Sequence, residues 1–181
     1  MGLLGTTRCG EASALAVIVV LMGVSGAGKT TVGRLLAAEL GWPLYDADDF
    51  HPAANIEVMR AGSPLTDADR AAWLDALHGA LAELVREGKS AVLACSALKR
   101  SYRERLLGGD ADVARATRFV HLKGTPELIR RRLEARAHHF MPAALLPSQF
   151  AILEEPVDAV AIDIAASPAM IVRRIRRALR I

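Results

Sequence analysis

The sequence Gly23-Val24-Ser25-Gly26-Ala27-Gly28-Lys29-Thr30 decides the fold, because it joins a strand pattern to a helix pattern. Residues 16–22 before it are a continuous apolar run, typical of a strand that is covered on both faces of a parallel sheet. Residues 29–40 after it carry apolar side chains at helical spacing, and Gly41 is a good stop signal for that helix. The spacing G-x-x-x-x-G-K-[ST] in this context predicts a phosphate-binding loop.

The loop predicts a nucleoside triphosphate such as ATP as the ligand. Its glycines let successive backbone N–H groups point at the phosphates, and the following helix N-terminus adds its dipole. Lys29 is expected to reach the β- and γ-phosphates, and the hydroxyl of Thr30 to bind Mg²⁺. All eight residues from Gly23 to Thr30 are therefore candidate nucleotide-binding residues.

Strand and helix patterns alternate along the rest of the chain. Apolar or β-rich segments at residues 42–46, 91–94, 117–122 and 157–164 predict strands, and helical patterns lie between them. This alternation predicts an α/β fold with a parallel sheet. Residues 14–181 are expected to form one domain, and residues 1–13 a disordered extension.

Composition and cysteine content favour a soluble enzyme. The 181 residues are 52% hydrophobic and 24% charged, with a net charge of +3, which excludes a disordered chain. Cys9 and Cys95 make no disulfide framework, so a reducing, cytoplasmic location is expected. The apolar stretch 14–24 is too short to span a bilayer, so no membrane contact is expected.

The arginine-rich C-terminus raises the alternative of nucleic-acid binding. Residues 173–177 read Arg-Arg-Ile-Arg-Arg, but Ile171, Val172, Ile175 and Leu179 form an apolar stripe at helical spacing. This pattern favours an amphipathic surface helix, and no nucleic-acid partner is expected.

The carboxylates expected near the metal do not follow the strand at 91–94. That strand ends in Cys95 and Ser96, whereas Asp46 and Asp48 follow the strand before it in the chain. Ligands gather at the carboxyl ends of parallel strands, so both acids should face the phosphate loop. One of them could hold Mg²⁺ while the other accepts a proton from a substrate hydroxyl. Asp49 is better explained as a solvated residue of the same turn.

Two groups of basic residues are candidates for anion binding. Arg132 and Arg136 are four apart on a predicted helix and share a face, so they could stabilise charge on the transferred phosphoryl group. Lys99, Arg100 and Arg103 open the helix after Ser96, where they could bind an anionic group on the second substrate. The competing interpretation of such charge runs is a solvated helix face.

Three further motifs in order carry a family resemblance. The segments DADDFHP (46–52), CSALKRSYR (95–103) and HFMP with SQF (139–142 and 148–150) are more specific than the phosphate loop. With that loop, they make the chain similar to the bacterial-type gluconokinases, small P-loop sugar-acid kinases related to shikimate kinase. The resemblance covers residue 17 to the C-terminus.

The resemblance implies a three-layer α/β/α P-loop kinase with a helical substrate-covering segment at about 49–78 and a mobile lid at about 133–150. It implies phosphorylation of D-gluconate on its 6-hydroxyl by ATP with Mg²⁺, and a possible homodimer. Asp48 would be the general base and Asp46 the acid on the metal side. The expected gluconate-binding residues are Asp48, His51, Lys99, Arg100 and Arg103, with Arg132 and Arg136 closing on the phosphates.

Two rival functions remain open at this point. The first is another small-molecule kinase of the same fold, acting on shikimate or a nucleoside monophosphate. The second is a regulator that hydrolyses nucleotide to switch a partner, although no water-positioning residue is evident in the sequence.

Overall fold

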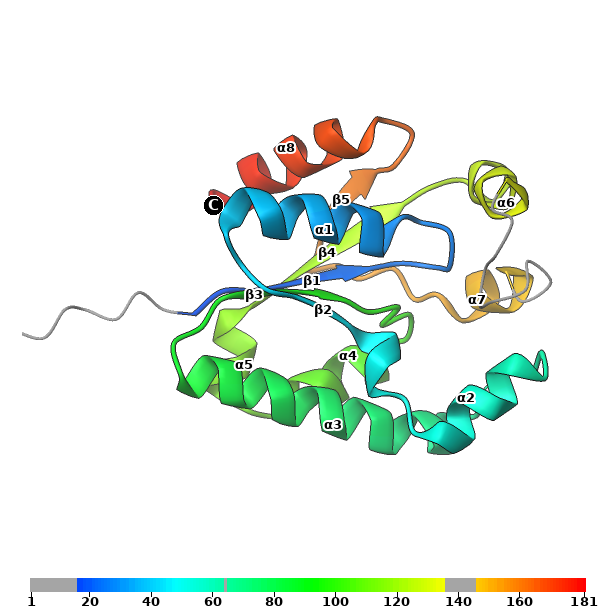
Figure 1. The fold of residues 1–181 in the computed structure, drawn as a ribbon, viewed down its shortest axis with the longest axis horizontal. Helices are drawn as coiled ribbons and strands as arrows, with labels where there is room; N and C mark the ends of the chain where they lie inside the picture. Colours follow the sequence, from blue (N-terminus) through cyan, green and yellow to red (C-terminus); the bar gives the residue numbers. More distant parts are fainter. Residues whose placement is uncertain (1–15, 64, 136–145) are drawn as a thin grey trace, which may run out of the picture.

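The computed structural model describes residues 16–63, 65–135 and 146–181 (Figure 1). The expected extension at residues 1–13 and part of the expected lid lie outside these ranges. Within them, no helix has the length and apolar character needed to cross a membrane.

A five-stranded parallel sheet forms the centre, in the order β2-β3-β1-β4-β5. The central strand β1 pairs with β3 on one side and β4 on the other, so all five of its residues are buried. The strands are β1 (Ile18–Met22), β2 (Leu44–Asp46), β3 (Ala91–Ala94), β4 (Thr117–Lys123) and β5 (Val160–Asp163).

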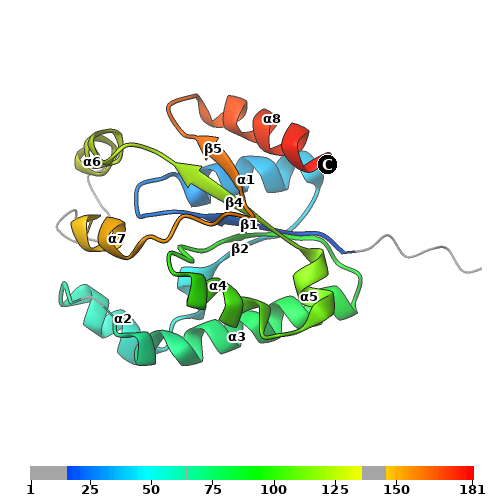
Figure 2. The ribbon, with the colours of Figure 1, turned by 180° about the vertical axis from the view of Figure 1, so that it is seen from behind.

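Helices cover both faces of the sheet, which confirms the three-layer α/β/α fold (Figures 1 and 2). One face carries α1 (Lys29–Leu40) and α8 (Pro168–Leu179), and the other carries α3 (Asp67–Arg86), α4 (Arg100–Leu107) and α5 (Ala111–Ala116). Alternate residues of β1 face opposite layers. Val19 and Leu21 belong to the core under α1 and α8, while Ile18 and Val20 belong to the core over α3 and α4.

The remaining helices stand at the carboxyl end of the sheet. They are the 3₁₀ turn η1 (Ala47–Phe50), α2 (Ala53–Arg60), α6 (Pro126–Glu134) and α7 (Leu146–Ile152). Figure 1 shows α2 on one side of this end and α6 and α7 on the other. Substrate sites of parallel α/β proteins lie at this edge, so these helices frame the candidate site.

The C-terminal helix α8 is an amphipathic surface helix, as its pattern predicted. Ile171, Val172 and Ile175 are buried, while Arg173 and Arg174 are exposed.

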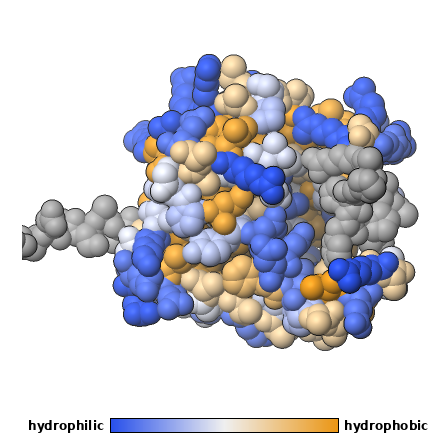
Figure 3. Space-filling view, in the orientation of Figure 1, coloured by the Kyte–Doolittle hydropathy of each residue, from blue (hydrophilic) through white to orange (hydrophobic). Residues whose placement is uncertain are grey.

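On the face shown in Figure 3, hydrophobic residues are interspersed with hydrophilic ones over the coloured surface.

One helix and the bounds of two strands differ from what the sequence patterns predict. Helix α5 was not predicted, and it begins where the Asp110 side chain accepts hydrogen bonds from two backbone N–H groups. The strand pattern at 42–46 forms a strand only over Leu44–Asp46. Pro43 before it has no N–H to donate, although its carbonyl accepts from the N–H of Val92 at 3.0 Å. The pattern at 157–164 pairs only over Val160–Asp163, because Val157 stands in a turn with 94% of its surface exposed.

Candidate active site

The phosphate loop follows the buried end of β1 and runs into the N-terminus of α1. The N–H of Gly23 donates to the carbonyl of Ser96 at 3.2 Å, which ties the loop to the turn after β3. Gly26 has a φ of +82°, and a Cβ built there would lie 2.8 Å from Cγ of Leu133. A side chain at this position would be strained and would collide with α6, so the loop requires glycine here.

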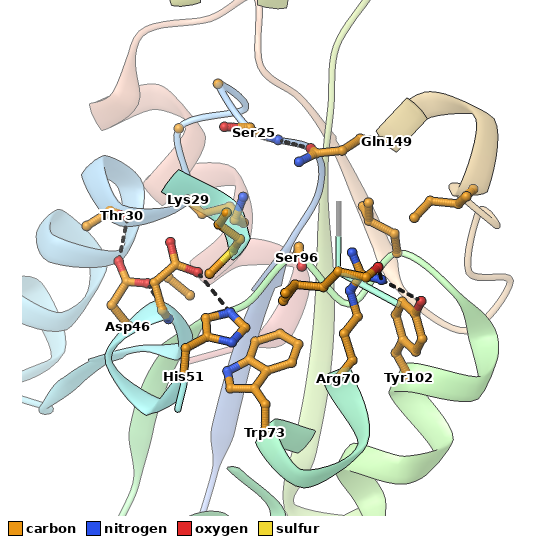
Figure 4. Close-up of a pocket in the computed structure, with 18 of the residues that line it drawn as sticks. Ser25, Lys29, Thr30, Asp46, His51, Arg70, Trp73, Ser96, Tyr102 and Gln149 are labelled. Carbon is orange, nitrogen blue, oxygen red and sulfur yellow. Dashed lines mark hydrogen bonds and ion pairs between the residues drawn. The ribbon is translucent and has the colours of Figure 1, made fainter. Parts of the chain in front are cut away.

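Two donors of the loop, Lys29 Nζ and the Ser25 N–H, are hydrogen-bonded within the protein; Figure 4 shows the Ser25 bond. The Nζ of Lys29 donates to the carbonyls of Gly23 at 3.0 Å and Val24 at 3.2 Å. The backbone N–H of Ser25 donates to Oε1 of Gln149 at 2.6 Å. A bound phosphate would take over donors that now serve carbonyl and amide oxygens.

Asp46 lies directly beside the loop. Its Oδ2 accepts a hydrogen bond from the Thr30 hydroxyl at 2.8 Å. Its Oδ1 accepts one from the N–H of Asp48 at 3.2 Å, which starts the turn η1. The end of β2 and the start of α1 therefore place a hydroxyl and a carboxylate together.

Asp48 faces the same cleft and has a raised pKa. Removal of water by the surrounding protein is the main cause, the negative charge of Asp46 adds to it, and the positive charge of Lys29 opposes it. The side chain still has 74% of its surface exposed, because the cleft is open to solvent. We therefore expect water to weaken this pKa shift until the cleft closes over a substrate.

His51 forms one wall of the cleft in its neutral form. Its ring stacks on Trp73 with the ring centroids 4.3 Å apart, and Trp73 donates from Nε1 to the carbonyl of Ala47 at 2.7 Å. Burial and the nearby charge of Arg70 lower the His51 pKa from 6.5 to about 4. Nε2 lies 4.0 Å from Oδ1 of Asp48, and within the described ranges Nδ1 is buried with no hydrogen-bond partner.

The lowered pKa of His51 predicts a loss of stability in mild acid. The unfolded chain binds a proton at this residue near pH 6.5, whereas the folded chain binds it only near pH 4. The stabilising contribution is therefore complete above pH 6.5 and is lost as pH falls toward 4. Urea denaturation at pH 7 and pH 5 should show that the wild type loses roughly 1–2 kcal/mol more than His51→Asn. Equal losses in the two proteins would contradict a neutral, buried His51.

The opposite wall carries a cluster of charged and polar side chains from α3 and α4. The Nη1 of Arg70 donates to the carbonyl of Leu65 and, at 3.4 Å, to the hydroxyl of Tyr102. Lys99 donates to both carboxylate oxygens of Asp67, at 2.9 and 2.7 Å, and Tyr102 donates to Asp67 as well.

These walls enclose a cavity of about 150 Å³ at the carboxyl end of the sheet. The phosphate loop, Asp48, His51, Arg70 and Gln149 all line it, as Figure 4 shows for most of them. A neighbouring cavity of about 260 Å³ is also lined by Arg70 and Gln149 and additionally by Lys99. The site thus joins a phosphate loop to a polar space of small-molecule size.

Known proteins share this sequence along most of its length. A family model described as an AAA domain matches residues 18–156. A gluconokinase from Gluconobacter oxydans is 54% identical over 140 residues, which are 77% of this chain and 76% of the relative. The thermosensitive gluconokinase of Escherichia coli is 43% identical over 164 residues, or 88% of this chain and 86% of the relative.

The chain belongs to the gluconokinase family. The solved structure of a gluconokinase from Sinorhizobium meliloti agrees, with a TM-score of 0.76, 39% identity, and coverage of 92% of this chain and 97% of that one. A shikimate kinase from Bacteroides thetaiotaomicron has a TM-score of 0.65 at 19% identity, covering 91% of this chain and 99% of that one, and shows the shared fold alone.

Several of the sequence-predicted residues share one cavity. Lys29, Thr30, Asp46, Asp48 and His51 all line the 150 Å³ cavity. Their roles stay predictions, but the structure brings them together from the loop, β2 and η1.

Two of the three basic residues after Ser96 are not in the cleft. Arg100 extends into solvent and pairs with Glu104 at 2.7 Å, because the first turn of α4 points it away from the sheet edge. Arg103 is buried and donates to the carbonyls of Ala97 and Leu98, so it braces the turn before α4. Only Lys99 borders the neighbouring cavity, where it pairs with Asp67.

Arg132 lies on the other side of the phosphate loop from the acids. Its Nη2 donates to the carbonyl of Ile164 at 2.6 Å, and it lines a separate hollow with Gly28 and Thr31. Arg136 lies outside the described residues, as do residues 136–145 of the expected lid. In the expected covering segment 49–78, Met59 and Leu65 line the 150 Å³ cavity.

Sequence reasoning missed Arg70, Tyr102 and Gln149. A signal for Arg70 was present, since it stands three residues before Trp73 and seven before Leu77 on the apolar stripe of α3. A lone arginine on a buried stripe indicates a specific partner. Gln149 belongs to the SQF motif (148–150), but the motif does not indicate what the side chain contacts, because only the folded chain places α7 beside the loop.

Proposed function

We propose that this gluconokinase transfers the γ-phosphoryl group of ATP to the 6-hydroxyl of D-gluconate. The observation that supports it best is the position of Asp48, which shares one cavity with the phosphate loop and with Arg70. A proton acceptor, a phosphate donor site and an anion-binding group then surround one small acceptor. The gluconokinase names of the relatives give the acceptor its identity.

The residues beside the loop fit Mg²⁺. The Thr30 hydroxyl and the Asp46 carboxylate, 2.8 Å apart, are the hard oxygen ligands that this ion prefers. No cluster of three or more His, Cys, Asp or Glu side chains suited to a metal occurs in the described ranges. Mg²⁺ is usually bound by one or two carboxylates together with waters and substrate phosphates. When bound, Mg²⁺ neutralises charge on the phosphate oxygens.

The chain itself positions both substrates and moves the proton. The loop N–H groups and Lys29 hold the phosphates of ATP, and Arg132 and Arg136 add positive charge near them. Asp48 orients the acceptor hydroxyl and accepts its proton as the oxygen attacks phosphorus. Its raised pKa makes it a better proton acceptor than an ordinary aspartate.

Arg70 is the group we assign to the carboxylate of the sugar acid. Its described hydrogen bonds, to Leu65 and Tyr102, and its ion pair with Asp67 all use Nη1. The Nε and Nη2 donors make no hydrogen bond within the described ranges, and this edge of a guanidinium can grip a carboxylate with two bonds. Arg70 thus takes the role that sequence reasoning gave to Lys99, Arg100 and Arg103.

A substrate panel tests this function. ATP consumption should depend on D-gluconate, and shikimate or AMP in its place should give rates near the background. Turnover with shikimate or AMP, but none with gluconate, would favour another small-molecule kinase of the same fold. ATP hydrolysis that no acceptor stimulates would favour the regulatory switch.

The expected homodimer and cytoplasmic location stay predictions. Sedimentation of the purified protein tests the first, and cell fractionation tests the second.

A further inference from the structure

One contact in the cleft joins the nucleotide site to α7. The backbone N–H of Ser25 donates to Oε1 of Gln149 at 2.6 Å (Figure 4). Backbone N–H groups of such loops are the donors that hold phosphate oxygens. The amide oxygen of Gln149 therefore holds a backbone donor of the phosphate-binding loop.

The same side chain also borders the space assigned to the sugar acid. Gln149 lines both the 150 Å³ cavity and the neighbouring one, together with Arg70. Ile152, one turn further along α7, lines both cavities too. A movement of the Gln149 amide away from Ser25 thus remains within reach of the acceptor site.

Phosphate and amide compete for the Ser25 N–H. A charged phosphate oxygen makes a stronger hydrogen bond than a neutral amide oxygen, so bound nucleotide displaces Gln149. We propose that Gln149 couples the two substrates: its amide occupies a phosphate position in the empty loop, and nucleotide binding releases it to hydrogen-bond the sugar acid. This inference rests on the proposed function for the identity of the second ligand.

The coupling has two thermodynamic consequences. Nucleotide must break the Ser25–Gln149 bond, so its affinity for the empty enzyme is lower by roughly five-fold, the net worth of one hydrogen bond. The released amide strengthens sugar-acid binding, and by linkage each ligand raises the affinity for the other by the same factor.

Calorimetric titration with a non-hydrolysable ATP analogue and Mg²⁺, in the absence of gluconate, tests the first consequence. Gln149→Ala should bind the analogue about five-fold more tightly than wild type, because nothing has to be displaced. Gln149→Glu should bind it more weakly, because a carboxylate holds the Ser25 N–H more strongly and repels phosphate. Ala151→Ser, on the exposed side of α7, is the matched control and should bind like wild type.

Titration with gluconate, with and without the saturating analogue, tests the second consequence. In the wild type the analogue should tighten gluconate binding about five-fold, and in Gln149→Ala this factor should fall to about one. Weaker analogue binding by Gln149→Ala would overturn the proposal, since Gln149 would then be a nucleotide ligand. An unchanged coupling factor in that variant would overturn it as well.

The two titrations separate this inference from the proposed function. If gluconate does not bind at all, the proposed function fails. Tighter analogue binding by Gln149→Ala would still show that Gln149 competes with nucleotide for the phosphate loop. If gluconate is phosphorylated but Gln149→Ala keeps the coupling, only the inference fails.

Discussion

Asp48→Asn lowers kcat with gluconate by about 10²- to 10⁴-fold, the usual effect of removing a positioned general base. Asparagine has the shape of aspartate but cannot accept the hydroxyl proton. The KM for gluconate should change little, because the amide can still hydrogen-bond the hydroxyl. Steady-state rates with varied gluconate and saturating ATP measure both quantities.

The raised pKa of Asp48 adds a pH signature to this prediction. Protonation removes the base, so kcat should fall on the acidic side at a higher pH than an ordinary aspartate would give. Asp49→Asn, which alters the exposed neighbour on the same turn, is the control and should keep kcat. The Asp49 charge is the smallest of the causes that raise the Asp48 pKa, so its removal should move the pH profile only slightly toward acid. Full activity in Asp48→Asn would exclude the general-base role.

Arg70→Ala raises the KM for gluconate by about 10- to 100-fold, the range for losing charged hydrogen bonds to a carboxylate. The KM for ATP should stay within about two-fold of wild type, since Arg70 is not part of the phosphate loop. The same kinetic assay, with each substrate varied in turn, separates the two effects.

Two controls protect this result from a folding artefact. Arg70 also bonds the carbonyl of Leu65, so a thermal melt of Arg70→Ala must show a folded protein. Arg100→Ala removes the exposed arginine that pairs with Glu104, and it should leave the KM for gluconate unchanged. The opposite pattern would be a normal KM in Arg70→Ala and a raised KM in Arg100→Ala. It would show that Arg100 on α4, and not Arg70, binds the carboxylate of gluconate.

The sequence was most informative where short-range geometry decides the structure. The phosphate loop is specified by glycines that no other residue can replace, and Gly26 shows why, with its positive φ and its contact with Leu133. The acids Asp46 and Asp48 were predictable because a parallel sheet brings strand ends together. The Thr30–Asp46 bond follows from those two facts.

The positions of the other site residues depend on how each helix is rotated about its axis and on packing between distant segments. No short stretch of sequence specifies either. Lys99, Arg100 and Arg103 lie within five residues but point in three directions at the start of α4. Lys99 pairs with Asp67, Arg100 extends into solvent, and Arg103 is buried in the protein. The contact of Gln149 with Ser25 joins segments 124 residues apart. Such pairings require the folded chain, because no periodic pattern reports them.

The most direct test of the account is the identity of the product. ³¹P NMR of a mixture of enzyme, ATP, Mg²⁺ and gluconate should show a phosphomonoester signal coupled to the two protons on carbon 6, growing as the ATP signals decline. Inorganic phosphate as the only product, or a phosphoester coupled to a different carbon, would contradict the assignment of Asp48 and the cleft to the 6-hydroxyl of gluconate.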